Sequence, residues 1–160
     1  MAILVFSRRA LWVAISAVAA GLLAWAVFEF QPSRQLHRTF EKFVTAGERR
    51  DWETAASFLA SDYRDDWGHD RETGIATASE LLGHFFFLEI TTNPVKITVN
   101  GSRGEVRTRP RLAGNGTAIA QYVMTRANEL QQEMTFVWRR ESWKPWDWKL
   151  VSVHQPEISG

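Results

Sequence analysis

The chain has 160 residues, a formal net charge of +1 and no cysteine. This length suits one domain rather than two, and the nearly neutral charge gives no general reason to expect nucleic acid as a partner. The absence of cysteine excludes disulfides, thiolate metal sites and cysteine nucleophiles.

The N-terminal sequence predicts a membrane anchor. Residues 10–28 carry no charged side chain, and such a run is just long enough to span a bilayer, with residues 10–30 as the membrane contact. Arginines before the run and tryptophans near its ends predict a single-pass protein of a bacterial-type inner membrane, with a cytoplasmic N-terminus and the domain outside. These flanking residues are Arg8, Arg9, Trp12 and Trp25. A signal peptide cleaved near Ala26 is the alternative, and it exports the rest of the chain equally well.

Three helices are expected after a short linker at residues 31–33. Apolar residues at helical spacing predict the first helix, which ends near Gly47. Asp51 is the expected N-cap of the second, and Thr77 with Glu80 has the spacing of a capping box that opens the third. This third helix is expected to run through Phe85.

Beyond Leu88 the apolar period changes to two, which predicts strands. The turn signal Asn100-Gly101 separates a strand at 95–100 from one at 105–112, and the glycines at 114–116 predict another turn. Further strands are expected at 119–125, 133–139 and 146–154. Arg107, Arg109 and Arg111 would then form a basic stripe on one strand face. This stripe would contact acidic lipid headgroups or an acidic partner, or it would be a solvated outer face.

These elements predict an α+β fold: an N-terminal transmembrane helix at 1–30, then a domain at 34–157 with three helices packed on a strongly curved antiparallel sheet. The helix pair "FEKFVTAGERRDWETAASFLASDY", the loop "DDWGHDRETG" and the closing "DWKLVSVH" resemble the nuclear transport factor 2-like superfamily. Its polyketide-cyclase-like and ketosteroid-isomerase-like members look similar in this order of elements. The resemblance implies a cone-shaped α+β barrel with a pocket at its open end, and many members dimerise through the sheet.

The acidic loop from Asp62 to Glu72 contains the best candidates for chemistry. The resemblance places a His-Asp stretch near the pocket mouth, which makes His69 the candidate general base and Asp70 its orienting acid. The alternative is a solvated loop whose aspartates cap turns. The loop does not match the spacing of an EF-hand, and we expect neither a metal nor a cofactor. Further pocket or binding candidates are Tyr63, Trp67, His84, Phe85, Tyr122 and His154.

Two functions compete at this stage. The first is a membrane-anchored extracytoplasmic domain that binds a protein partner or a small apolar ligand without catalysis. The second is a dehydratase, isomerase or cyclase that uses His69, although the sequence lacks the tyrosine that ketosteroid-isomerase-like enzymes place on the first helix. A third possibility is a purely structural dimer whose pocket is filled by its own aromatic side chains. A homodimer formed through the sheet fits all three.

The tryptophans near the C-terminus divide by position. Trp148 is expected to pack in the core from the last strand, whereas Trp143 is expected to be exposed in a hairpin. Strand alternation puts five residues on one face: Trp146, Trp148, Leu150, Ser152 and His154.

Overall fold

The computed structural model describes residues 15–23 and 31–158. Residues 15–23 are helical, but within the described ranges no helix combines the length and the apolar run that a bilayer span requires. The flanking residues Arg8, Arg9, Trp12 and Trp25, like most of the predicted anchor, lie outside the described residues.

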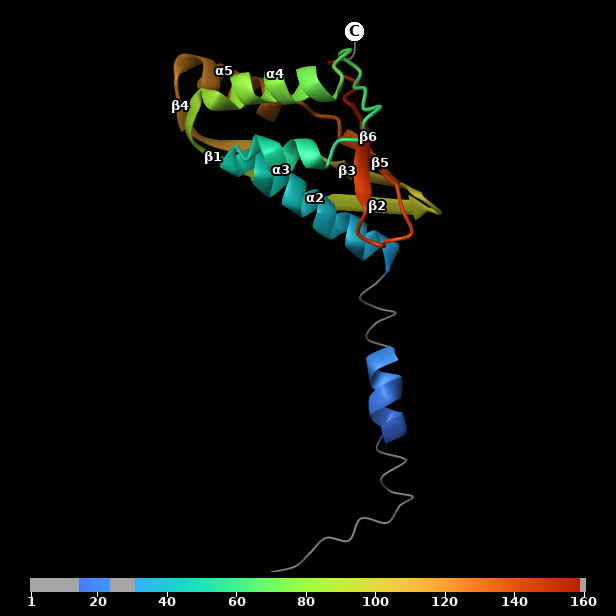
Figure 1. The fold of residues 1–160 in the computed structure, drawn as a ribbon. Helices are drawn as coiled ribbons and strands as arrows, with labels where there is room; N and C mark the ends of the chain where they lie inside the picture. Colours follow the sequence, from blue (N-terminus) through green and yellow to red (C-terminus); the bar gives the residue numbers. More distant parts are fainter. Residues whose placement is uncertain (1–14, 24–30, 159–160) are drawn as a thin grey trace, which may run out of the picture.

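The domain is an α+β fold in which three helices come first, four strands follow, and a further helix precedes the last two strands (Figure 1). The helices are α2 (Pro32–Arg49), α3 (Trp52–Ser57), α4 (Arg71–Gly83) and α5 (Ala118–Glu129). The strands are β1 (Phe85–Thr91), β2 (Val95–Asn100), β3 (Arg103–Thr108), β4 (Arg111–Gly116), β5 (Met134–Arg140) and β6 (Trp148–His154).

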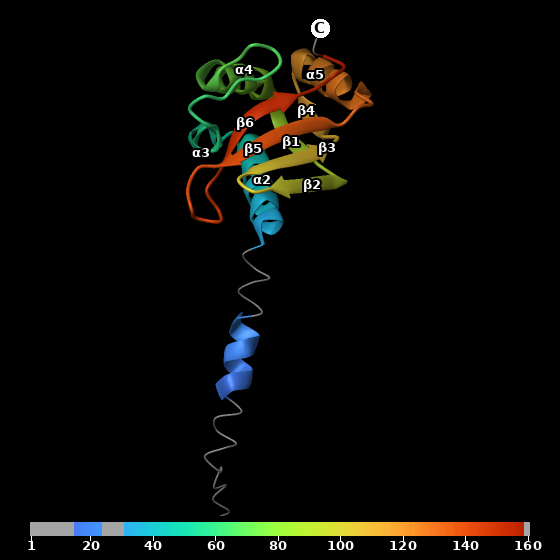
Figure 2. The same ribbon diagram turned by 90° about the vertical axis from the view of Figure 1, so that its right-hand side faces the viewer.

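The strands form two antiparallel sheets rather than the single curved sheet predicted. One has four strands in the order β2-β3-β5-β6, and the other pairs β1 with β4. In Figure 2 the four-stranded sheet faces the viewer, with α2 behind it. Among the described residues the sheets do not join, so the helices lie on an open α+β arrangement and not in a closed barrel.

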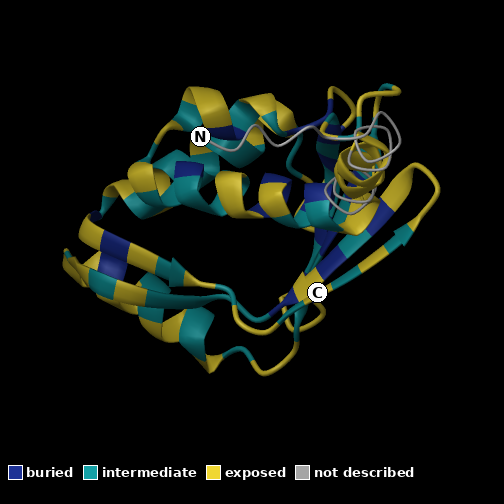
Figure 3. Ribbon diagram, turned by 90° about the horizontal axis from the view of Figure 1, so that it is seen from below, coloured by how far each residue is buried: buried dark blue, intermediate teal, exposed yellow. Residues whose placement is uncertain are grey.

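The main core lies between α2 and the inner face of the four-stranded sheet. Figure 3 shows buried and exposed positions alternating along α2, as expected for an amphipathic helix. Its buried Leu36 and Phe40 pack with Trp138 and Trp148 of the sheet. Trp148 is 1% exposed and Trp143 is 84% exposed, which confirms their predicted locations.

A predicted strand and the bounds of a predicted helix were wrong. Residues 119–125 belong to helix α5, because Thr117 caps it by accepting a hydrogen bond from the Ala120 N–H, and alanine-rich sequence follows. The third helix starts at Arg71 and not near Thr77, since the Asp70 side chain caps it. This helix ends before Phe85, which begins β1.

The predicted strand at 105–112 divides at Arg109-Pro110 into β3 and β4, which belong to different sheets. Arg107, Arg109 and Arg111 therefore do not form one stripe. The glycines expected to form a turn at 114–116 lie in β4 instead. A Cβ atom on Gly114 would come within 2.1 Å of the Phe87 carbonyl oxygen, so the close pairing with β1 requires glycine there.

Candidate functional site

The loop at residues 60–70, between α3 and α4, lies along the outer edge of β6. Three backbone hydrogen bonds hold it there: Ala60 N–H to Leu150 O at 2.9 Å, Arg64 N–H to Val151 O at 3.0 Å, and Asp66 N–H to Val153 O at 3.3 Å. The acidic loop is thus fixed to the sheet, because its backbone continues the hydrogen bonding of β6.

Asp65 organises the turn that follows. Its Oδ1 accepts hydrogen bonds from the backbone N–H groups of Trp67, at 3.0 Å, and His69, at 2.8 Å. The backbone N–H of Asp65 donates to the His69 carbonyl oxygen at 3.2 Å. Gly68 has a φ of 84°, a conformation that side chains disfavour and that this turn needs.

The same turn places the His69 ring against the Asp65 carboxylate. His69 Nδ1 lies 3.0 Å from Asp65 Oδ2, and the Asp65 side chain is only 4% exposed, compared with 31% for His69. A carboxylate accepts hydrogen bonds, so a neutral His69 donates from Nδ1 and keeps a free lone pair on Nε2. This is the tautomer that a general base acting through Nε2 requires.

Both residues line an apolar cavity of about 540 Å³ between α2, α4 and the inner face of the four-stranded sheet. Apolar side chains from each of these elements contribute to its wall, among them Phe43, Ile75, Leu81, Phe136 and Val153. A volume of 300–1,000 Å³ is typical of small-molecule sites. The His–Asp pair is thus a polar group in a mostly apolar cavity.

Tyr63 is a third polar group in the wall of this cavity. It is 6% exposed, and its hydroxyl lies 3.5 Å from Asp65 Oδ2. Burial, together with the negative charge of Asp65, raises the pKa of Tyr63 well above its usual value. Tyr63 therefore stays protonated at neutral pH and donates its hydroxyl proton to Asp65.

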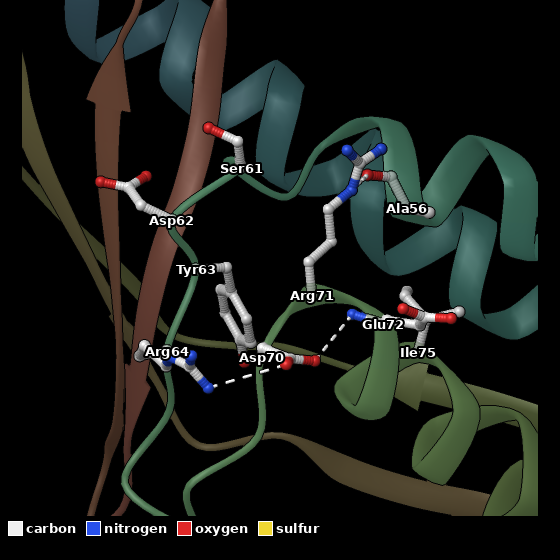
Figure 4. Close-up of a pocket in the computed structure, with 9 residues that line it drawn as sticks. All are labelled: Ala56, Ser61, Asp62, Tyr63, Arg64, Asp70, Arg71, Glu72 and Ile75. Carbon is white, nitrogen blue, oxygen red and sulfur yellow. Dashed lines mark hydrogen bonds and ion pairs between the residues drawn. The ribbon is translucent and has the colours of Figure 1, made fainter.

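Asp70, expected to orient His69, lies elsewhere. Its carboxylate accepts from the Glu72 and Thr73 N–H groups and caps α4, and Asp65 is the acid beside the imidazole. Figure 4 shows Asp70 in a second pocket, of about 590 Å³, with Arg64 at 3.7 Å from its carboxylate. Tyr63 lines both pockets and separates the polar one from the apolar one.

Of the other sequence candidates, Tyr63 and Trp67 line the apolar cavity. The remaining four are not among its lining residues. His84 is the C-cap of α4, and Phe85 is buried against Leu88 and Ala120. Tyr122 is 65% exposed on α5, and His154 pairs with Asp66.

Sequence reasoning missed Asp65, although one signal pointed to it. Asp65 and His69 are four residues apart with Gly68 between them, a spacing that permits a compact turn with a side chain folded over it. Among the described residues, no group of three or more histidine or acidic side chains is arranged to hold a metal ion.

No family model matches the chain, and no curated protein matches it. Solved structures do. Bd1075 of Bdellovibrio bacteriovorus is 13% identical with a TM-score of 0.58 over 76% of this chain, which spans 38% of the length of Bd1075. A candidate dehydratase of the nuclear transport factor 2-like family from Streptomyces avermitilis is 20% identical with a TM-score of 0.57, over 76% of this chain and 92% of that one.

A candidate ketosteroid isomerase from Shewanella frigidimarina is 14% identical with a TM-score of 0.53, over 78% of this chain and 94% of that one. Identities this low establish the fold and leave the activity open. The predicted resemblance is confirmed at that level: the chain has the fold of the nuclear transport factor 2-like superfamily.

Proposed function

We propose that the apolar cavity binds a small apolar carbonyl compound and that His69 moves a proton on it, as in a dehydratase or an isomerase. The observation that carries this proposal is the 3.0 Å contact between His69 Nδ1 and the nearly buried Asp65 carboxylate in the cavity wall. The candidate dehydratase and isomerase with the same fold are consistent with this chemistry.

The proposed step begins with His69 Nε2, which takes a proton from the carbon next to the substrate carbonyl. Asp65 stabilises the imidazolium that forms, because it accepts the Nδ1–H bond. The electron pair moves into an enolate, whose oxygen takes over from Asp65 as the acceptor of the Tyr63 hydroxyl. In a dehydratase the C–O bond to the β-hydroxyl group then breaks, and that group leaves as water with the proton held by the imidazolium. In an isomerase the imidazolium returns the proton to another carbon.

Solvent exchange tests the step without knowledge of the substrate. The protein is incubated in D₂O with cyclic ketones and β-hydroxyketones, and deuterium incorporation next to the carbonyl is followed by NMR. Exchange should depend on His69 and be lost in His69→Ala. His37→Gln is a matched control, because His37 lies on the surface of α2, 3.7 Å from Glu41.

The same experiment separates catalysis from binding. Chemical shift changes of the cavity residues without deuterium exchange would favour the ligand-binding domain predicted as the competing function. Exchange that persists in His69→Ala would contradict the assignment of the base.

We also propose that residues 10–28 hold the domain at the outer face of a membrane. The uncharged run supports this location, and so does the loop at 141–147 between β5 and β6. That loop lies at the end of the domain where α2 begins (Figures 1 and 2). In this loop Trp143 is 84% exposed and Trp146 is 56% exposed. Tryptophan side chains favour the headgroup region of a bilayer.

The absence of cysteine makes this location easy to test. An environment-sensitive dye on Trp143→Cys should shift to the blue when the full chain is reconstituted in lipid vesicles. The same dye on Ile119→Cys, an exposed position on α5 at the opposite end, should not shift. Equal spectra at both positions would count against contact with the membrane. The expected protein partner and homodimer stay predictions.

A further inference from the structure

A second histidine–aspartate pair lies on the side of β6 that faces away from the apolar cavity, and a serine lies next to its histidine. His154 Nδ1 is 2.6 Å from Asp66 Oδ1, and His154 Nε2 is 2.9 Å from Ser152 Oγ. We propose that Ser152 is an activated nucleophile that accepts acyl groups from small esters, with His154 as its base and Asp66 as the acid that orients the base.

A β-bulge in β6 creates this arrangement. Val137 pairs with Ser152 and Trp138 with Leu150, so β6 has one additional residue, Val151, at this point. After the bulge Val153 is 6% exposed and faces the core, so its neighbours Ser152 and His154 face outward. The strand alternation predicted from the sequence, with Leu150, Ser152 and His154 on one face, fails for this reason.

The partner that each ring nitrogen of His154 contacts supports the proposed roles. Asp66 accepts a hydrogen bond, so His154 Nδ1 carries the proton and Nε2 is left to accept the Ser152 hydroxyl proton. This is the division of roles in serine hydrolases: the acid fixes the tautomer, and the free nitrogen activates the hydroxyl.

The three side chains are held in place and can be reached from solvent. Asp66 is attached to the strand through its backbone N–H, which donates to the Val153 carbonyl oxygen at 3.3 Å. The side chains of His154 and Asp66 are 45% and 26% exposed. A small ester can therefore approach Ser152 from the outer face without entering the apolar cavity.

The step balances with an ester and water alone. Ser152 Oγ bonds to the carbonyl carbon while its proton passes to His154 Nε2. The C–O bond to the leaving alcohol then breaks, and the alcohol takes that proton from the imidazolium. Water hydrolyses the acyl-serine by the same steps. Stabilisation of the oxyanion is a separate requirement, so acylation of Ser152 is the measurement that tests the proposal.

The experiment treats the full chain with a fluorophosphonate probe and with p-nitrophenyl acetate, and identifies the modified residues by mass spectrometry of peptides. Ser152 should react at least about tenfold faster than Ser142, a serine of similar exposure in the 141–147 loop, because a positioned base accelerates proton removal. His154→Gln and Asp66→Asn should remove this difference. Equal labelling of the two serines, or labelling of Ser152 that both variants leave unchanged, would overturn the proposal.

A second pair of variants covers the case in which His154→Gln does not fold. Ser152→Cys and Ser142→Cys each introduce one thiol into a chain that has none. Iodoacetamide should alkylate the thiol at position 152 about tenfold faster, since His154 assists loss of its proton. Equal rates would mean that the three side chains only hold the loop to the strand. Neither result depends on His69, so this test is independent of the function proposed for the cavity.

Discussion

Substitution of Asp65 tests whether one carboxylate both builds the turn and sets the tautomer of His69. Asp65→Ala removes the acceptor for two backbone N–H groups and for the imidazole. Hydrogen bonds to a charged acceptor contribute about 1.5–3 kcal/mol each to stability. Because local opening of the loop limits their combined contribution, we expect Asp65→Ala to lower the free energy of unfolding by about 2–4 kcal/mol. Asp65→Asn retains an oxygen for both N–H groups and should cost about 1 kcal/mol.

The effect of Asp65→Asn on activity should be larger than its effect on stability. The asparagine amide donates where the carboxylate accepted, so the ring must accept at Nδ1 and carry its proton on Nε2. This removes the lone pair that takes the substrate proton, and deuterium exchange should fall about 10²–10⁴-fold.

Urea unfolding measures the stability of each variant, and NMR in D₂O measures exchange with the ketone probes. Asp147→Asn is a matched control, because Asp147 lies in the 141–147 loop at the far end of the domain. Equal destabilisation by Asp65→Ala and Asp65→Asn would refute the account of the turn. Unchanged exchange in a folded Asp65→Asn protein would refute the account of the tautomer.

Two further predictions concern the frame around the site. Gly104→Ala should lower the free energy of unfolding by about 1–3 kcal/mol, because the added Cβ would lie 2.4 Å from Leu36 Cδ2 in the core. Gly83→Ala is the control: nothing lies within 4 Å of its added Cβ, so urea unfolding should show no measurable change. Hydrogen bonds from Thr73 hold the pKa of Asp70 in the folded protein below its value in the unfolded chain. The charged Asp70 cap should therefore stabilise the protein fully above the unfolded carboxyl pKa. This stabilisation should disappear as the pH falls through the lower pKa of the folded state. The difference in melting temperature between wild type and Asp70→Ala should thus be full at pH 7 and vanish in acid, and a constant difference would contradict this.

Local sequence signals predicted the elements that local interactions determine. The apolar spacing of α2 and the Asp51 cap of α3 were both read correctly, since the Asp51 carboxylate accepts from the Thr54 N–H at 3.1 Å. The prediction of a strand at 119–125 was wrong because these residues suit a strand or a helix, and the Thr117 cap favours the helix. The division into two sheets depends on pairing between distant segments, which strand periodicity does not encode.

At the site, adjacency in the sequence was misleading. Asp70 follows His69 directly, but its carboxylate is engaged by the first turn of α4, whereas a turn brings Asp65 back over four residues to the ring. The resemblance pointed to His69 and its loop, and the structure places His69 in the wall of the apolar cavity. That Asp65, and not Asp70, lies beside the imidazole depends on the three-dimensional path of the loop.

The loop at 60–70 supplies the acid for both histidines. Consecutive residues of a segment paired along a strand point to opposite sides, so Asp65 faces the cavity and Asp66 reaches His154 on the outer face. Both pairs therefore depend on the same backbone hydrogen bonds between the loop and β6. A change that detaches the loop should disturb His69 and His154 together, whereas a change at either acid should disturb only its own histidine, which makes Asp65→Asn and Asp66→Asn controls for each other.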